Sequence, residues 1–185
     1  MSSPPAPGPI AVNSRSARGF TLVELAVVLT IIAVLLALVV GTLIRARASA
    51  NEASAVSAMK AVNSAQLAYL VSCGNGSYAT TLPRLATPPG GRSQGYLPEE
   101  FLAGLTVRRS GYDITLLPGM GAKPGALADC NGAPTQTAYY VRAVPTSYRQ
   151  TGVKAYATNM RTTIFEQEGP TAPAEPFGPP AAPVK

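Results

Sequence analysis

An uninterrupted apolar run lies near the start of the chain. After Glu24, residues 25–44 contain no charged side chain, and fourteen of these twenty residues are Leu, Ile or Val. Twenty residues is about the length that an α-helix needs to cross the hydrocarbon core of a bilayer. Glu24 opposes insertion by about 2 to 3 kcal/mol, and the apolar residues outweigh it with about −4 to −8 kcal/mol. The run therefore predicts a membrane-spanning helix.

The helical pattern continues beyond the apolar run. No proline occurs between Pro9 and Pro83, and residues 45–71 are mostly types that tolerate a helix. At 100° per residue, five apolar side chains fall within an arc of about 140°. They are Val56, Met59, Val62, Leu67 and Leu70, and four serines lie opposite them: Ser54, Ser57, Ser64 and Ser72. We therefore expect one helix over 20–72, about 80 Å long, whose outer half packs on a C-terminal domain.

Strand patterns appear only in the last third of the chain. Residues 111–117 alternate, residues 137–144 form a second candidate strand, and 152–158 with 161–165 predict a hairpin around Asn159 and Met160. Three or four antiparallel strands with one apolar face can cover the outer helix. The expected fold is α+β, with a long N-terminal helix packed on a small antiparallel β-sheet head.

Composition limits the chemistry. The 185 residues include no His, which excludes catalytic triads that depend on His, and the net charge of +6 is scattered along the chain. Two other candidates are weak: the glycine-rich stretch 119–125 lacks phosphate-loop spacing, and four acids lack the spacing of a calcium loop. These acids are Asp113, Asp129, Glu166 and Glu168. We expect no metal, no cofactor and no catalysis.

Glu24 has two interpretations from its position alone. It is either a functional acid that needs a partner at membrane depth or a solvated acid in the headgroup region. The preceding residues add a motif: a Pro-rich, basic leader ends in Arg18-Gly19, and Phe20-Thr21-Leu22-Val23-Glu24-Leu25 follows. This order resembles the prepilin leader and mature start of type IV pilins and of the pseudopilins of type II secretion.

The resemblance implies specific roles for these residues. A membrane peptidase would cut between Gly19 and Phe20 and methylate the new terminus at Phe20. Glu24 would then pair with the terminal amine of a neighbouring subunit during assembly, since two desolvated opposite charges stabilise each other. Many pilins have Gly where this chain has Ala33 and Pro where it has Gly41, so local helix melting near Gly41 stays open.

The resemblance also divides the chain. The expected parts are a cleaved leader at 1–19, the long helix at 20–72 with its transmembrane part at 25–44, an αβ-loop at 73–110, and the β-sheet of the head at 111–168. The last part, 169–185, contains six prolines and is expected to be a flexible tail.

Two cysteines, Cys73 and Cys130, lie 57 positions apart. In an exported domain an even count favours a disulfide, which would be worth about 4 kcal/mol for a loop of this length; two free thiols are the alternative. Two cysteines without a histidine do not make a typical zinc site.

The function implied by the resemblance is that of a structural subunit of a type IV pilus-like fibre. Its partners would be other pilin subunits, prepilin peptidase, the inner-membrane assembly machinery and, before assembly, membrane lipid. It would be stored in the bacterial inner membrane with its head in the periplasm and then reach a pilus or pseudopilus. The charges flanking the span do not decide this orientation.

Three alternatives stay open. The first is a type II secretion pseudopilin, although the calcium ligands of major pseudopilins cannot be matched to this sequence. The second is a minor pilin that binds DNA or acts in adhesion, and the third is a single-pass anchored exported domain that keeps residues 1–19.

Overall fold

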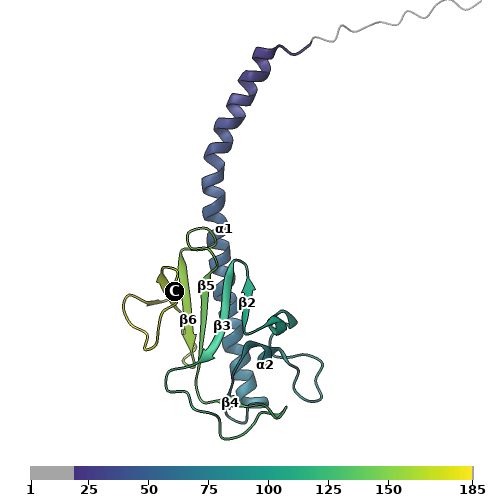
Figure 1. Ribbon diagram of the computed structural model, residues 1–185, viewed down its shortest axis with the longest axis vertical. Helices are drawn as coiled ribbons and strands as arrows, with labels where there is room; N and C mark the ends of the chain where they lie inside the picture. The colour runs from purple at the N-terminus through teal and green to yellow at the C-terminus, as the bar shows by residue number, and fades with distance from the viewer. Residues whose placement is uncertain (1–18, 185) are drawn as a thin grey trace, which may run out of the picture. The chain divides into compact units, whose positions relative to one another are not determined.

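A computed structural model describes residues 19–184, with the side chains of 38–40 left out, so most of the predicted leader lies outside the described residues. The chain divides into two compact units, residues 1–40 and 41–185. The helix α1, Leu22–Ser72, has 51 residues and continues through Gly41 (Figure 1). Its end follows from the sequence, because Gly74 and Gly76 donate backbone hydrogen bonds to Tyr69 and Leu70 after the last turn.

The second unit contains the predicted antiparallel sheet. Six strands pair in the order β2-β3-β5-β6-β7-β8, and two short strands, β1 and β4, pair separately. The strands are β1 (Tyr78–Ala79), β2 (Thr106–Arg109), β3 (Tyr112–Pro118), β4 (Thr135–Gln136), β5 (Tyr139–Pro145), β6 (Lys154–Asn159), β7 (Phe165–Glu168) and β8 (Ala182–Pro183). A short helix α2 (Leu82–Ala86) and a 3₁₀ helix η1 (Glu99–Ala103) precede β2. The expected α+β fold is confirmed.

One core joins the outer half of α1 to the sheet. Met59 and Val62 of α1 are fully buried, as are Ile114 of β3 and Val141 of β5. Figure 1 shows the strands β3, β5 and β6 lying across this half of α1. The two layers therefore bury each other's apolar face.

The predicted helix face is correct at Met59 and Val62 but wrong farther along. Leu67 is 45% exposed and Leu70 is only partly buried. Polar side chains occupy the buried stripe instead, because each finds a partner in the head. Asn63 donates to Thr158 Oγ1 at 3.1 Å, and Gln66 exchanges two hydrogen bonds with the backbone of Ala79.

The predicted αβ-loop has more structure than expected. Residues 73–110 hold β1, α2, η1 and β2, each too short to give a clear period in the sequence. Thr81 caps α2 by accepting a hydrogen bond from the Arg84 N–H. The second strand of the predicted hairpin is also displaced, because β7 begins at Phe165 after a turn in which the Thr162 N–H bonds to Asn159 O.

The prediction of a flexible tail without regular structure is wrong. The strand β8 pairs with β7, and the Val184 N–H donates to Ile164 O. Upstream of β8, the Phe177 ring stacks on Phe165 with centroids 4.5 Å apart. Proline removes backbone donors, but this segment is held by side-chain contacts and a single short edge strand, where prolines are tolerated.

Candidate assembly site at the start of the long helix

The start of α1 is set by a cap that also positions the predicted assembly acid. Thr21 precedes the first helical residue, and its Oγ1 accepts a hydrogen bond from the Glu24 N–H at 3.2 Å. Thr21-Leu22-Val23-Glu24 thus has the Thr-x-x-Glu spacing of a capping box, in which the Thr21 hydrogen bond is formed. This Thr-x-x-Glu spacing is a sequence signal for a helix start.

The cap gives Glu24 a local role besides assembly. A carboxylate in the first turn lies at the positive end of the helix dipole and is stabilised there by about 0.3 to 1 kcal/mol. Within residues 19–184 the Glu24 carboxylate forms no hydrogen bond and no ion pair, and the residue is exposed. The acid therefore lies where an ammonium group could reach it.

The surface of the helix behind Glu24 is apolar on every side. Each large apolar residue from Phe20 to Leu36 is between 43% and 84% exposed. They are Phe20, Leu22, Val23, Leu25, Val27, Val28, Leu29, Ile31, Ile32, Val34, Leu35 and Leu36. A surface of this size and uniformity marks a site for lipid or for other protein surfaces. In length and composition the helix is able to cross a membrane.

These features indicate a membrane-anchored chain whose capped, acidic helix start is available to a partner. The prokaryotic N-terminal methylation motif matches residues 14–40, so this chain begins with the leader signature of type IV pilins and pseudopilins. The signature supports a precursor that prepilin peptidase processes and that assembles into a fibre. No curated protein and no solved structure matches the chain.

The predicted disulfide lies at the opposite end of α1. Cys73 and Cys130 are bonded, and the Cys130 N–H also donates to Cys73 O at 2.8 Å. The bridge fixes the loop before β4 to Cys73, the first residue after α1. The predicted pairing is confirmed. We expect the disulfide to stabilise the fold of the head.

A buried acid next to this bridge secures the same loop. The Asp129 side chain is fully buried, and its Oδ2 accepts a hydrogen bond from Tyr69 at 2.8 Å and lies 3.6 Å from Arg84 Nε. Burial by itself would raise the pKa of Asp129, but the Ala133 N–H, the Tyr69 hydroxyl, the Asn131 N–H and the Arg84 charge together lower it. Burial and this hydrogen bond raise the pKa of the Tyr69 hydroxyl.

The other candidate acids do not gather. Asp113 pairs with Arg108 at 2.9 Å, and Glu166 pairs with Lys154 at 2.8 Å. In residues 19–184, no three His, Cys, Asp or Glu side chains form a group that could hold a metal ion. Asp113, Asp129 and Glu166 are thus each explained by a local contact.

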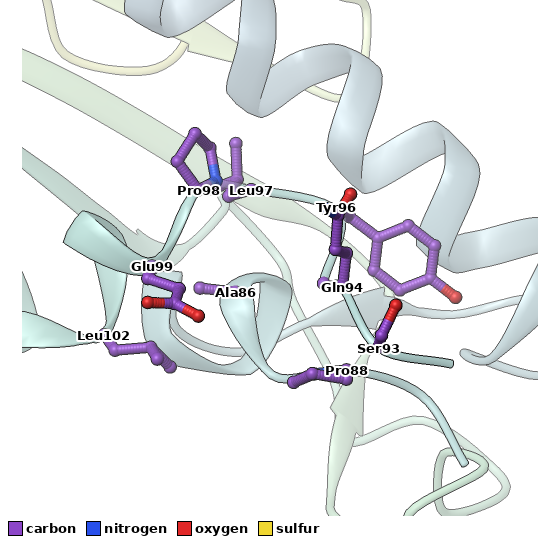
Figure 2. A pocket seen from close by; sticks show the side chains of 10 residues that line it. Ala86, Pro88, Ser93, Gln94, Tyr96, Leu97, Pro98, Glu99 and Leu102 are labelled. Carbon is purple, nitrogen blue, oxygen red and sulfur yellow. The ribbon is translucent and has the colours of Figure 1, made fainter. Parts of the chain in front are cut away.

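A pocket of about 500 Å³ lies beside α2 and η1 (Figure 2). Tyr96 borders it, and its hydroxyl lies 2.6 Å from Ser72 Oγ at the end of α1. Glu99 is its one acidic lining residue. The lining residues are Ala86, Pro88, Ser93, Gln94, Gly95, Tyr96, Leu97, Pro98, Glu99 and Leu102.

Proposed function

We propose that this chain is a structural subunit of a type IV pilus-like fibre. The observation that carries the proposal is the methylation motif at 14–40 leading directly into a helix with an exposed apolar surface. Prepilin peptidase cuts after Gly19 and methylates Phe20. The chain is stored in the bacterial inner membrane through residues 25–44, with its head in the periplasm.

Assembly places the apolar helix surface against the same surface of neighbouring subunits. The helix leaves lipid for another apolar environment, so the hydrophobic effect changes little and specific protein contacts decide the balance. Cleavage creates an ammonium group at Phe20, directly before the capping residue Thr21. This charge lies at the positive end of the helix dipole, which disfavours it. The Glu24 carboxylate of a neighbouring subunit compensates it and sets the register of the fibre.

Three alternatives use the same chain differently. A type II pseudopilin would build a short periplasmic fibre, and the surrounding gene cluster distinguishes it. A minor pilin that binds DNA would show binding that weakens steeply with salt. A single-pass anchored domain would keep residues 1–19 and stay unassembled. No catalytic role is part of this proposal.

The decisive experiment is mass spectrometry of the N-terminus of the protein isolated from membranes. In cells with an active prepilin peptidase, we expect the chain to begin at Phe20 with a methyl group on its amine. Cells that lack the peptidase should yield the intact leader and provide the control. An intact leader in both strains would refute the proposal and leave the anchored domain.

A further inference from the structure

The head begins close to the predicted membrane boundary. Ala48 is only 8% exposed and follows the last residue of the predicted span, Ile44, by four residues, which is about 6 Å along a helix. One turn later, Asn51 Nδ2 donates to Thr151 O in the loop between β5 and β6 at 3.0 Å. The headgroup layer of a bilayer is about 5 to 7 Å thick on each side. With residues 25–44 in the hydrocarbon core, as in the proposed function, Ala48 would lie in the headgroup layer.

Two arginines of α1 lie over the contacts that hold this end of the head. Arg45 precedes Glu52 by seven residues, so both lie on one face of the helix, two turns apart. The Glu52 carboxylate accepts hydrogen bonds from the backbone N–H groups of Val153 and Lys154 at 2.8 and 3.3 Å. These hydrogen bonds hold the start of β6 against α1 two helical turns after Arg45.

Arg47 likewise lies two turns before a residue of α1 that contacts the head, here at the turn between β2 and β3. It precedes Ser54 by seven residues, and Ser54 Oγ donates to Ser110 Oγ in the turn between β2 and β3 at 2.9 Å. Side chains on a helix tilt toward its N-terminus. Arg45 and Arg47 therefore tilt toward the N-terminal end of α1, one on each side of the stripe that the head covers.

A third arginine comes from the loop between β5 and β6. Arg149 adopts a left-handed backbone with φ of 66°, and its guanidinium lies 5.3 Å from the centre of the Tyr148 ring. Thr151 Oγ1 donates to Ser147 O and accepts from the Ser147 N–H, which closes the loop on itself. Figure 1 shows this loop at the end of β5 and β6 that lies beside α1.

These arginines differ from others at the same end of the sheet. Arg108 pairs with Asp113, and Arg109 pairs with Glu100. Arg45, Arg47 and Arg149 are exposed and form no ion pair with residues 19–184. We call Arg45, Arg47 and Arg149 the basic collar. The described part of the chain therefore leaves these three positive charges without an ion pair.

We propose that the basic collar binds the phosphate groups of anionic phospholipids while the chain is stored in the membrane. An arginine near an anionic membrane surface adds about fivefold to the affinity, so three together add about a hundredfold. Tyr148 beside Arg149 suits the same depth, because tyrosine is enriched at membrane interfaces. This inference rests on the membrane storage in the proposed function.

The test uses the full chain in detergent micelles, titrated with phosphatidylglycerol or with zwitterionic phosphatidylcholine, and native mass spectrometry counts the bound lipids. The wild type should prefer phosphatidylglycerol. The variant with Arg45→Gln, Arg47→Gln and Arg149→Gln should lose about a hundredfold in phosphatidylglycerol affinity while its phosphatidylcholine affinity stays unchanged. Hydrogen exchange in nanodiscs should show phosphatidylglycerol protecting residues 146–153.

A matched control removes three charges elsewhere: Arg92→Gln, Lys123→Gln and Arg161→Gln. The side chains of these residues make no hydrogen bond or ion pair with residues 19–184, and the variant should bind phosphatidylglycerol like the wild type. Equal binding of both lipids by the wild type, or equal losses of phosphatidylglycerol affinity in the two variants, would overturn the proposal that the basic collar binds anionic phospholipids. Failure of the chain to enter nanodiscs would refute membrane storage itself, which is a separate result.

Discussion

The two halves of α1 have opposite surfaces. From Phe20 to Leu36 every large apolar side chain is substantially exposed, whereas from Ala48 to Cys73 one stripe is buried and the opposite side is mostly polar or small, apart from the exposed Leu67 and Val71. A helix that is apolar on every side must be buried by lipid or by other protein chains. An amphipathic helix can bury its apolar face against its own domain. The contrast separates the part of the molecule that folds from the part that anchors and assembles.

Buried polar side chains fix how the second half of α1 packs on the sheet. The Asn63 side chain contacts three segments, because it donates to Thr158 Oγ1 and to Thr162 O and accepts from the Tyr139 hydroxyl at 3.1 Å. Such a buried amide allows only one register between helix and sheet, since any shift would leave it unsatisfied. In the first half, Thr30 bonds only to the carbonyl of Val27 in its own helix. This hydrogen bond fixes no register between the first half and another segment.

The largest effect is expected from removing the acid of the first half. Glu24→Ala should leave cleavage after Gly19 intact and reduce the fibre content to background, because the terminal ammonium loses its partner. Sheared fibres and membrane fractions are compared by immunoblot. Glu99→Ala, which removes an exposed acid of η1, should assemble normally. Normal fibres from Glu24→Ala would show that the acid does not set the register.

The next effect concerns the second half alone. Replacing both Cys73 and Cys130 by serine should lower the free energy of unfolding of the head by about 4 kcal/mol, because the unfolded chain regains the freedom of a long loop. The measurement is chemical denaturation of the full chain in micelles, followed by the near-ultraviolet circular dichroism of its eight tyrosines. The reduced wild type is the control and should match the variant. A loss below 1 kcal/mol would mean that the loop is held by its other contacts.

A pair of truncations tests the contrast directly. Met59→Ala should destabilise the head by about 2 to 5 kcal/mol, since Met59 is fully buried and the change leaves a cavity. Leu36→Ala should leave the unfolding of the head unchanged, because Leu36 is 58% exposed in the single chain. The same denaturation measurement serves both variants. Equal losses would show that the two halves do not differ as described.

The smallest effect depends on pH. The pKa of Asp129 is lower in the folded chain than its ordinary value of 3.8, so the unfolded chain takes up this proton first as pH falls. The stabilisation is complete above about pH 5 and is lost as the pH falls through the folded pKa. Asp129→Asn should therefore lower the free energy of unfolding at pH 7 by about 2 kcal/mol, seen as a lower midpoint of thermal unfolding. The difference in midpoint between the variant and the wild type should shrink below about pH 4.

Asp113→Asn is the control for this pH dependence. Asp113 pairs with Arg108, whose side chain is 72% exposed, and surface pairs contribute little. Its variant should unfold close to the wild type at both pH values. A difference for Asp129→Asn that stays constant with pH would show that its carboxylate is not the stabilising form.

The sequence was sufficient for the large features. A twenty-residue apolar run and a helix-tolerant stretch with glycines at its end predicted α1 within two residues, and alternation predicted β3 and β5. The order Gly19, Phe20, Glu24 indicated the motif that the family comparison then matched. These signals are local, so neighbouring residues determine them.

Features that depend on distant contacts were missed. Gln66 and Tyr69 do not look like core residues, yet both are buried because Ala79 and Asp129 satisfy their polar atoms. Leu67 looks apolar but faces away from the sheet. The strand β8 has two residues and exists only because β7 offers an edge. Periodicity cannot report partners that the chain brings together only on folding.

The C-terminal segment has a practical consequence for labelling the protein. The Glu175 carboxylate accepts hydrogen bonds from the Met120 N–H and from Asn159 Nδ2, and the Phe177 ring covers Phe165. A fluorescent domain or affinity tag fused here would pull on β7, the neighbour of the central strands. The turn at Gly90 and Gly91 is a better insertion point, because the space around both glycines is open. A fibre built from subunits tagged there would keep the edge of its sheet closed.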